Sequence, residues 1–129
     1  MITDDMRIAM QGILPSIIGT CDPDGIPNVV AISQTYYVDT DHVAISHQFF
    51  NKTIRNIQTN PNVCLVILHP SEVTRWVLHA THSHSETEGP VFDQMSMQLE
   101  AIASMIGMED VFKLQAAEIF KVNSVECRT

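Results

Sequence analysis

The chain of 129 residues is acidic, with 15 Asp and Glu residues against 7 Lys and Arg residues and a formal net charge of −8. Hydrophobic residues make up 45% of it, which is typical of a globular protein and excludes a disordered one. The negative charge argues against general nucleic-acid binding, because neutralising phosphates requires a basic surface. The length suits a single domain over residues 1–129.

The same composition bears on location. The apolar runs are short and interrupted by Gly, Pro or charged residues, so we expect no membrane span. The N-terminus carries Asp4 and Asp5 and lacks the basic-then-apolar pattern of a signal peptide. Three widely spaced cysteines argue against a disulfide framework and fit a reducing compartment. We therefore expect a cytoplasmic protein.

The first half of the chain predicts a short helix followed by strands and tight turns. Thr3 can cap a helix that runs to about Gly12. Two strand–turn–strand units follow, with turns at Asp22–Gly25 and Asp39–Asp41, and this succession is typical of an antiparallel meander. The expected strands are residues 16–21, 27–35 and 42–46, and residues 36–38 are expected to lead into the second turn.

The second half alternates helices with longer strands. Asn60-Pro61 stops a short helix, and Gly89-Pro90 opens a longer amphipathic helix that Gly107 ends. About six strands with three helices predict a mainly β (α+β) fold, a small antiparallel barrel with flanking helices rather than a doubly wound sheet. The expected elements are helices at residues 53–59 and 90–106 and strands at residues 63–68, 72–85 and 111–122.

One stretch of the acidic chain is free of carboxylates. No Asp or Glu lies between Asp41 and Glu72, and this gap holds Lys52 and Arg55. Lys52 and Thr53 stand where a helix is expected to begin, and free backbone N–H groups and the helix dipole favour a phosphate at such a position. The sequence therefore predicts an anion site here, and a short solvated basic turn is the alternative that charge alone leaves open.

Neutral polar residues precede the cations. His47, Gln48 and Asn51 offer donors and acceptors suited to a heterocycle or a sugar. Phe49 and Phe50 point to opposite sides of an extended chain, so one of them could face a ligand or a subunit. The chain contains neither GxxxxGK[ST] nor GxGxxG, so the sequence does not indicate an NTPase phosphate-binding loop or a dinucleotide-binding fold.

Several short motifs occur in a fixed order over residues 10–123. They are Gly25-x-Pro27-Asn28, Ser46–Thr53, Arg55-Asn56, Asn60-Pro61, Ser85–Pro90 with Phe92, Ile102–Ser104, Gly107-Met108 and Val111-Phe112-x-Leu114. In this order and spacing they resemble the FMN-binding split barrels related to pyridoxamine 5′-phosphate oxidase. The resemblance implies a six-stranded antiparallel split β-barrel, a homodimer, and FMN bound in a cleft between the two subunits.

The resemblance also implies which residues bind the cofactor. Lys52 and Thr53 match the family's phosphate-binding positions. The strand end at residues 46–48 matches the segment beside the flavin, which acts largely through its backbone, and residues 28–33 match the neighbouring strand. The cofactor-binding residues expected on this basis are Lys52, Thr53, Ser46, His47, Gln48, Asn51, Val30, Ala31 and Ile32.

The chain departs from the oxidase at two points. The oxidase carries an Arg-Lys pair where this chain has Asn51-Lys52, and the oxidase's substrate-binding Arg and His near its C-terminus have no counterpart here. We therefore expect a flavin-dependent oxidoreductase of unknown substrate rather than an enzyme that oxidises pyridoxamine phosphate. No nucleophile–base pair or carboxylate dyad stands out, which agrees with redox chemistry that belongs to the flavin.

Two other functions remain open, a haem-binding or haem-degrading split barrel and a non-catalytic sensory module. The first would use a histidine such as His79 or His82 as axial ligand. His82 and His84 are expected on one face of a strand and His79 on the other, and Glu86 is a further candidate metal ligand on the His82 face. No recognised zinc spacing is present, so no metal site is expected. Trp76 is expected in the core or an interface, with flavin stacking as the alternative.

Overall fold

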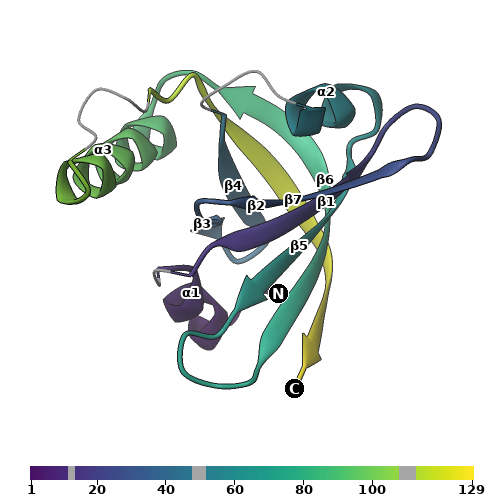
Figure 1. Ribbon diagram of the computed structural model, residues 1–129, viewed down its shortest axis with the longest axis horizontal. Coiled ribbons are helices and arrows are strands. Elements are labelled where there is room, and N and C mark those ends of the chain that lie inside the picture. The colour runs from purple at the N-terminus through teal and green to yellow at the C-terminus, as the bar shows by residue number, and fades with distance from the viewer. Residues whose placement is uncertain (12–13, 48–51, 108–112) are drawn as a thin grey trace.

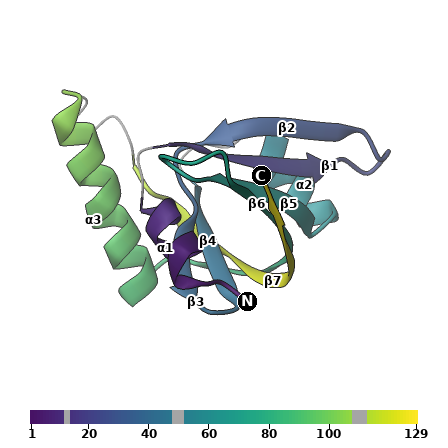
Figure 2. The same ribbon diagram turned by 90° about the horizontal axis from the view of Figure 1, so that it is seen from below.

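The structure, a computed structural model, describes residues 1–11, 14–47, 52–107 and 113–129. One antiparallel sheet curls into a barrel, helices α1 and α2 pack against its apolar interior, and α3 lies along its outer face (Figures 1 and 2). No described helix is both long and apolar enough to cross a bilayer. The described elements are α1 (Asp4–Met10), β1 (Ser16–Cys21), β2 (Pro27–Ile32), β3 (Tyr36–Asp39), β4 (His42–His47), α2 (Lys52–Thr59), β5 (Asn62–Leu68), β6 (Arg75–Glu86), α3 (Pro90–Met105) and β7 (Ala116–Arg128).

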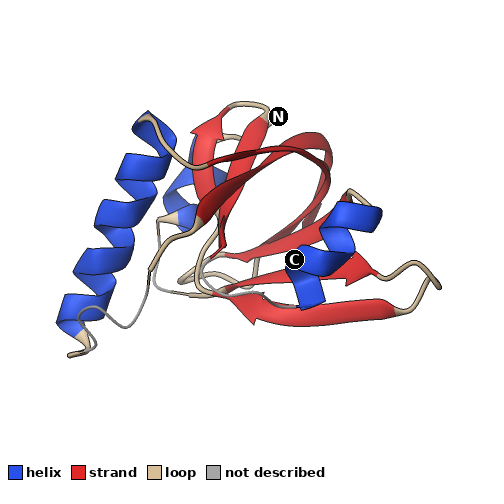
Figure 3. Cartoon of the chain, turned by 90° about the horizontal axis from the view of Figure 1, so that it is seen from above, coloured by secondary structure: helices blue, strands red, loops and turns tan. Residues whose placement is uncertain are grey.

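The sheet contains seven described strands in the order β2-β1-β5-β6-β7-β4-β3, and its neighbouring strands pair antiparallel. The predicted mainly β barrel with flanking helices is confirmed, and Figure 3 shows the helices around the curved sheet. The predicted count of six strands is wrong. Residues 36–39 form a strand of their own, because Tyr36 and Tyr37 pair with Ala44 and Val43 of β4 at the edge of the sheet.

The hairpin of β1 and β2 has the turn that its sequence predicts. Asp22 Oδ1 accepts hydrogen bonds from the backbone N–H groups of Asp24 and Ile26, each 2.9 Å long. Gly25 has a φ of 80°, a left-handed conformation that glycine adopts without steric cost. The turn fixes the register of the hairpin, in which Val30 lies opposite the fully buried Ile18.

The two longest strands join the halves of the barrel. β6 has 12 residues and β7 has 13, so each can pair along one part with one neighbour while curling toward the other. β7 pairs with β4 through residues 116–121 and with β6 along nearly its whole length. Because of this curl, β2 and β4, which stand far apart in the strand order, both contribute to one hollow.

Alternating side chains of β7 divide the apolar packing into two clusters. Phe120 and Val122 point into the barrel and belong to the large core that Ile54 and Ile57 of α2 also join. Ile119 points outward, where the smaller cluster holds α3 against the sheet. The predicted amphipathic helix is thus confirmed for its buried residues Met95 and Leu99, whereas Ile106 lies beyond the helix and is exposed.

Several predicted boundaries shift. The last strand runs over Ala116–Arg128 rather than residues 111–122, because β6 begins at Arg75 and offers a pairing partner as far as Arg128. Thr3 caps the first helix as predicted, but that helix ends at Met10 rather than near Gly12, which lies outside the described residues.

Helix α2 is attached to β1 by a buried polar contact. Asn56 Nδ2 donates to Thr20 Oγ1 at 3.0 Å, and both residues are buried. Ile54 and Ile57, on the same helix, are buried in the core. The helix is therefore held by apolar packing together with one hydrogen bond that water cannot replace.

We predict that Asn56→Ala destabilises the fold by about 1–3 kcal/mol, because it leaves the buried Thr20 hydroxyl without its partner. Urea denaturation measures the change. A matched control is Asn123→Ala, which removes an exposed hydrogen bond of 2.8 Å to Thr81. Its expected effect is below about 0.5 kcal/mol. Equal losses from the two variants would contradict a special role for the buried contact.

Candidate functional site

The candidate site is a hollow of about 350 Å³ formed by β2, the end of β4 and the start of α2. It lies where the curled sheet brings an edge strand beside the strand that leads into α2. Its lining residues are Asn28, Val30, Ala31, Ile32, Ile45, Ser46, Lys52, Thr53 and Ile54. Most of the residues expected to bind a cofactor are thus brought together: Val30, Ala31, Ile32, Ser46, Lys52 and Thr53.

The polar end of the hollow is the first turn of α2. Lys52 is exposed and makes no ion pair with any described residue, and the first turn contains no acidic residue. Thr53 is buried, with 5% exposure, and its hydroxyl accepts a hydrogen bond of 3.3 Å from Asn28 Nδ2. A cation, a hydroxyl and the N–H groups of a helix start therefore converge, which is the arrangement that binds phosphate groups.

The other side of the hollow is apolar. Val30 and Ile32 come from β2, Ile45 from β4 and Ile54 from α2. Sequence reasoning included Asn28 only as part of the matched strand of residues 28–33, and it named neither Ile45 nor Ile54 as a lining residue. The available signal was the alternation of β2, since Asn28 lies on the same side as Val30 and Ile32. An apolar wall beside a phosphate-binding end suits a planar ring system joined to a phosphate.

The remaining expected residues lie elsewhere. His47 ends β4 but does not line the hollow, because its ring turns toward Glu118. Its Nε2 atom is buried and has no hydrogen-bond partner among the described residues. Gln48 and Asn51 lie outside the described residues.

Glu118 is the centre of a buried polar cluster beside this site. It is 3% exposed, His82 Nε2 lies 3.0 Å from its carboxylate, and the Ser85 hydroxyl donates to the same carboxylate. His47 Nδ1 lies 3.7 Å away, at ion-pair distance. Burial raises the pKa of Glu118. The hydrogen bonds from His82 and Ser85 and the charges of both histidines lower it by more, so the pKa of Glu118 lies below its ordinary value. The carboxylate is therefore ionised at neutral pH.

A β-bulge explains how this cluster forms and corrects a prediction. The register of β6 against β7 shifts between His82 and His84, so Ser85, and not His84, lies on the Glu118 side with His82. The expectation that His82 and His84 share a face is wrong for this reason. The His84 ring is 53% exposed and lies 3.9 Å from Glu86 instead.

The other aromatic and histidine candidates lie apart from the hollow. Trp76 is buried in the core and does not line the hollow, so it offers no face for flavin stacking. His79 is about half exposed and lies 3.7 Å from Glu126. Among the residues that the structure describes, no three His, Cys, Asp or Glu side chains are arranged to hold a metal ion.

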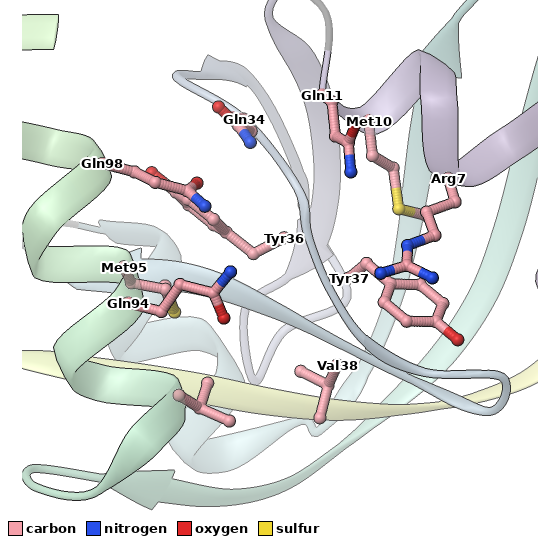
Figure 4. A pocket seen from close by; sticks show the side chains of 11 residues that line it. Arg7, Met10, Gln11, Gln34, Tyr36, Tyr37, Val38, Gln94, Met95 and Gln98 are labelled. Atoms are coloured by element: carbon pink, nitrogen blue, oxygen red, sulfur yellow. The ribbon is translucent and has the colours of Figure 1, made fainter. Parts of the chain in front are cut away.

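A second, smaller hollow of about 190 Å³ lies between α1, β3 and α3. In it the Arg7 guanidinium stacks on the Tyr37 ring at 4.4 Å, while Gln94 and Gln98 face them from α3 (Figure 4). None of the residues that line the first hollow contributes to it. The second hollow has Val91 from the first turn of α3 but no lysine or threonine at that helix start, which distinguishes it from the first hollow.

Comparison with solved structures identifies the fold. An FMN-binding protein of Syntrophomonas wolfei superposes with a TM-score of 0.81 at 16% identity, covering 98% of this chain and 85% of that one. An F420 reductase gives 0.68 at 14% identity, covering 93% and 94%. The haem storage protein HutZ of Vibrio cholerae gives 0.64 at 16% identity, covering 97% and 93%. At these identities the likeness shows the fold alone, that of the split β-barrels.

The sequence comparison defines the family. The sequence model of pyridoxamine 5′-phosphate oxidase matches residues 2–123, and the chain belongs to this family. An uncharacterized protein of Methanocaldococcus jannaschii is 42% identical over 66 residues, which are 50% of this chain and 44% of that protein. The match thus spans less than half the length of that relative.

The lowered pKa of Glu118 predicts a dependence of stability on pH. Because the pKa is lower in the folded state, the ionised carboxylate stabilises the fold above the ordinary value of 4.5, and this contribution is lost as the pH falls through the folded pKa. Glu118→Gln should cost about 2 kcal/mol at pH 7, and the difference from the unmodified protein should shrink below about pH 4.5. Urea denaturation at several pH values measures both.

A matched control is Glu126→Gln, since Glu126 also lies beside a histidine but is about half exposed. It should change stability little at pH 7. A stability difference for Glu118→Gln that stayed constant from pH 7 to pH 3 would contradict the ionised, histidine-paired state of this carboxylate.

Proposed function

We propose that this protein is an FMN-binding flavoprotein of the pyridoxamine 5′-phosphate oxidase family and acts as a flavin-dependent oxidoreductase. The observation that carries the proposal is the hollow in which an apolar wall from β2 and β4 meets Lys52 at the start of α2, a lysine that makes no ion pair with any described residue. An FMN-binding protein with the same fold supports the choice of cofactor.

The residues present fit the cofactor. Lys52, the Thr53 hydroxyl and the first N–H groups of α2 would hold the phosphate, and the β2 residues Val30 to Ile32 would lie along the ring system. His47 Nε2 is buried without a hydrogen-bond partner among the described residues, but His47 does not line the hollow, so the fit rests on Lys52, Thr53 and β2. FMN would supply the redox chemistry itself. The protein then orients the cofactor and excludes water from it.

The haem alternative has weaker support from the geometry. The HutZ protein shows that this fold occurs in a haem protein. However, His82 Nε2, the atom that would ligate iron, is engaged by the buried carboxylate of Glu118 at 3.0 Å. His79 remains available, but it lies beside Glu126 and does not line the phosphate-binding hollow.

We further propose a homodimer with the flavin at the subunit interface. β2 is an edge strand, and its apolar side chains Val29 and Val30 are 67% and 37% exposed. Because β2 also lines the hollow, a second copy packed on this strand would cover the flavin. We also propose that the chain forms a single domain and that the protein is cytoplasmic. The free thiols of the described cysteines fit the proposed location.

Lys52→Ala should weaken FMN binding by about 10- to 100-fold while leaving riboflavin binding unchanged, because only FMN carries the phosphate. Quenching of flavin fluorescence measures both affinities in the same buffer. Lys121→Ala, on an exposed position of β7 outside the hollow, is the matched control and should bind FMN like the unmodified protein. Equal losses for FMN and riboflavin would show that Lys52 does not contact the phosphate.

Val29→Lys should convert the dimer to a monomer and lower FMN affinity, because it places a charge in the proposed apolar interface. Sedimentation velocity with and without FMN measures the assembly. Val73→Lys is a control at a position that is 86% exposed, in the loop before β6, and it should remain dimeric. If the unmodified protein sediments as a monomer at every concentration, the proposed dimer is wrong.

A further inference from the structure

The barrel interior contains one charged side chain among the buried residues that the structure describes, Glu118. It occupies the inward row of β7 whose next members, Phe120 and Val122, are fully buried core residues. Within a row of this kind an apolar side chain is the expected choice, because burying a carboxylate costs several kcal/mol unless it is well paired. The presence of Glu118 therefore calls for a reason beyond packing.

Stability alone does not supply that reason. Replacing a buried ionic group by apolar residues of similar size is often neutral or stabilising. Glu118 has three polar partners on two other strands, His47 on β4 and His82 and Ser85 on β6, and a β-bulge in β6 brings the last two onto one side. The contacts of Glu118 orient the side chains of His47, His82 and Ser85 on the neighbouring strands. An apolar residue at position 118 would make no such polar contacts.

The cluster lies next to the candidate site in register. Glu118 is paired with Ile45, and Ile45 and Ser46 line the hollow. His47, the next residue, is held through its backbone by the N–H of Gln115, at 2.8 Å from its carbonyl oxygen, and through its ring by Glu118. The chain then leads to Lys52, where α2 begins. These two contacts of His47 fix the end of β4, and His47 is the last described residue before α2.

We infer that Glu118 is a positioning residue of the cofactor site, which acts through His47 on the end of β4, and this inference rests on the proposed function. The Glu118 carboxylate lies 3.7 Å from Nδ1 of His47, at ion-pair distance, so the ring is directed toward β7. Glu118 therefore sets the direction of the His47 ring and, with it, the placement of the strand end. Ser46 depends on the same strand end for its placement, because it directly precedes His47 and lines the hollow.

The test compares FMN affinity and the visible absorption spectrum of bound FMN in single and double variants. Glu118→Gln and His47→Ala should each weaken FMN binding by about tenfold and shift the spectrum of bound FMN, measured where thermal unfolding shows the protein to be folded. The double variant should bind no more weakly than either single variant, because the two residues act as one unit. Glu126→Gln, the exposed counterpart, should bind FMN like the unmodified protein.

The outcomes separate the inference from the proposed function. If the unmodified protein takes up no FMN, the proposed function fails and the inference fails with it. If it binds FMN while Glu118→Gln loses only stability, with affinity and spectrum unchanged, the inference alone is overturned. Additive losses in the double variant would also overturn it, because Glu118 would then not act through His47. Should Glu118→Gln not fold, His47→Ala decides, and unchanged affinity and spectrum in that variant reject the inference.

Discussion

The candidate site depends on the attachment of α2 to the barrel. Ile54 and Ile57 place this helix on the core, and the buried hydrogen bond from Asn56 to Thr20 fixes it on β1. With the helix held in this way, its first turn, with Lys52, opens onto β2 and the end of β4. The placement of the candidate site thus follows from core packing, because the contacts of Ile54, Ile57 and Asn56 fix where the first turn of α2 lies.

The second constraint is the curl of the sheet. β2 and β4 belong to different parts of the strand order and meet only because β6 and β7 are long and bend around the core. Glu118 lies where β4, β6 and β7 run side by side. Its pairing with His47 and His82 is therefore a feature of the tertiary structure, and it connects the interior of the barrel with the edge of the candidate site.

Local patterns in the sequence predicted what depends on local chemistry. The Asp22–Gly25 turn and the Thr3 cap follow from side chains that act on their own backbone. The helix near Lys52 follows from the spacing of Ile54 and Ile57, which both join the core. The Glu118 cluster could not be predicted, because it requires the register of three strands and a bulge that shifts Ser85 relative to His82. Membership of the family followed from the order of short motifs. The identity of the ligand does not follow from the fold, because the same fold occurs in an FMN-binding protein and in a haem storage protein.

The most direct test of the account is the absorption spectrum of the purified protein, together with the mass of any molecule that it releases on denaturation. The account predicts the two visible bands of an oxidised flavin, and release of FMN with its phosphate intact. A protein purified without colour should gain the same bands on addition of FMN. A haem Soret band, or a colourless protein that takes up no FMN, would contradict the central claim.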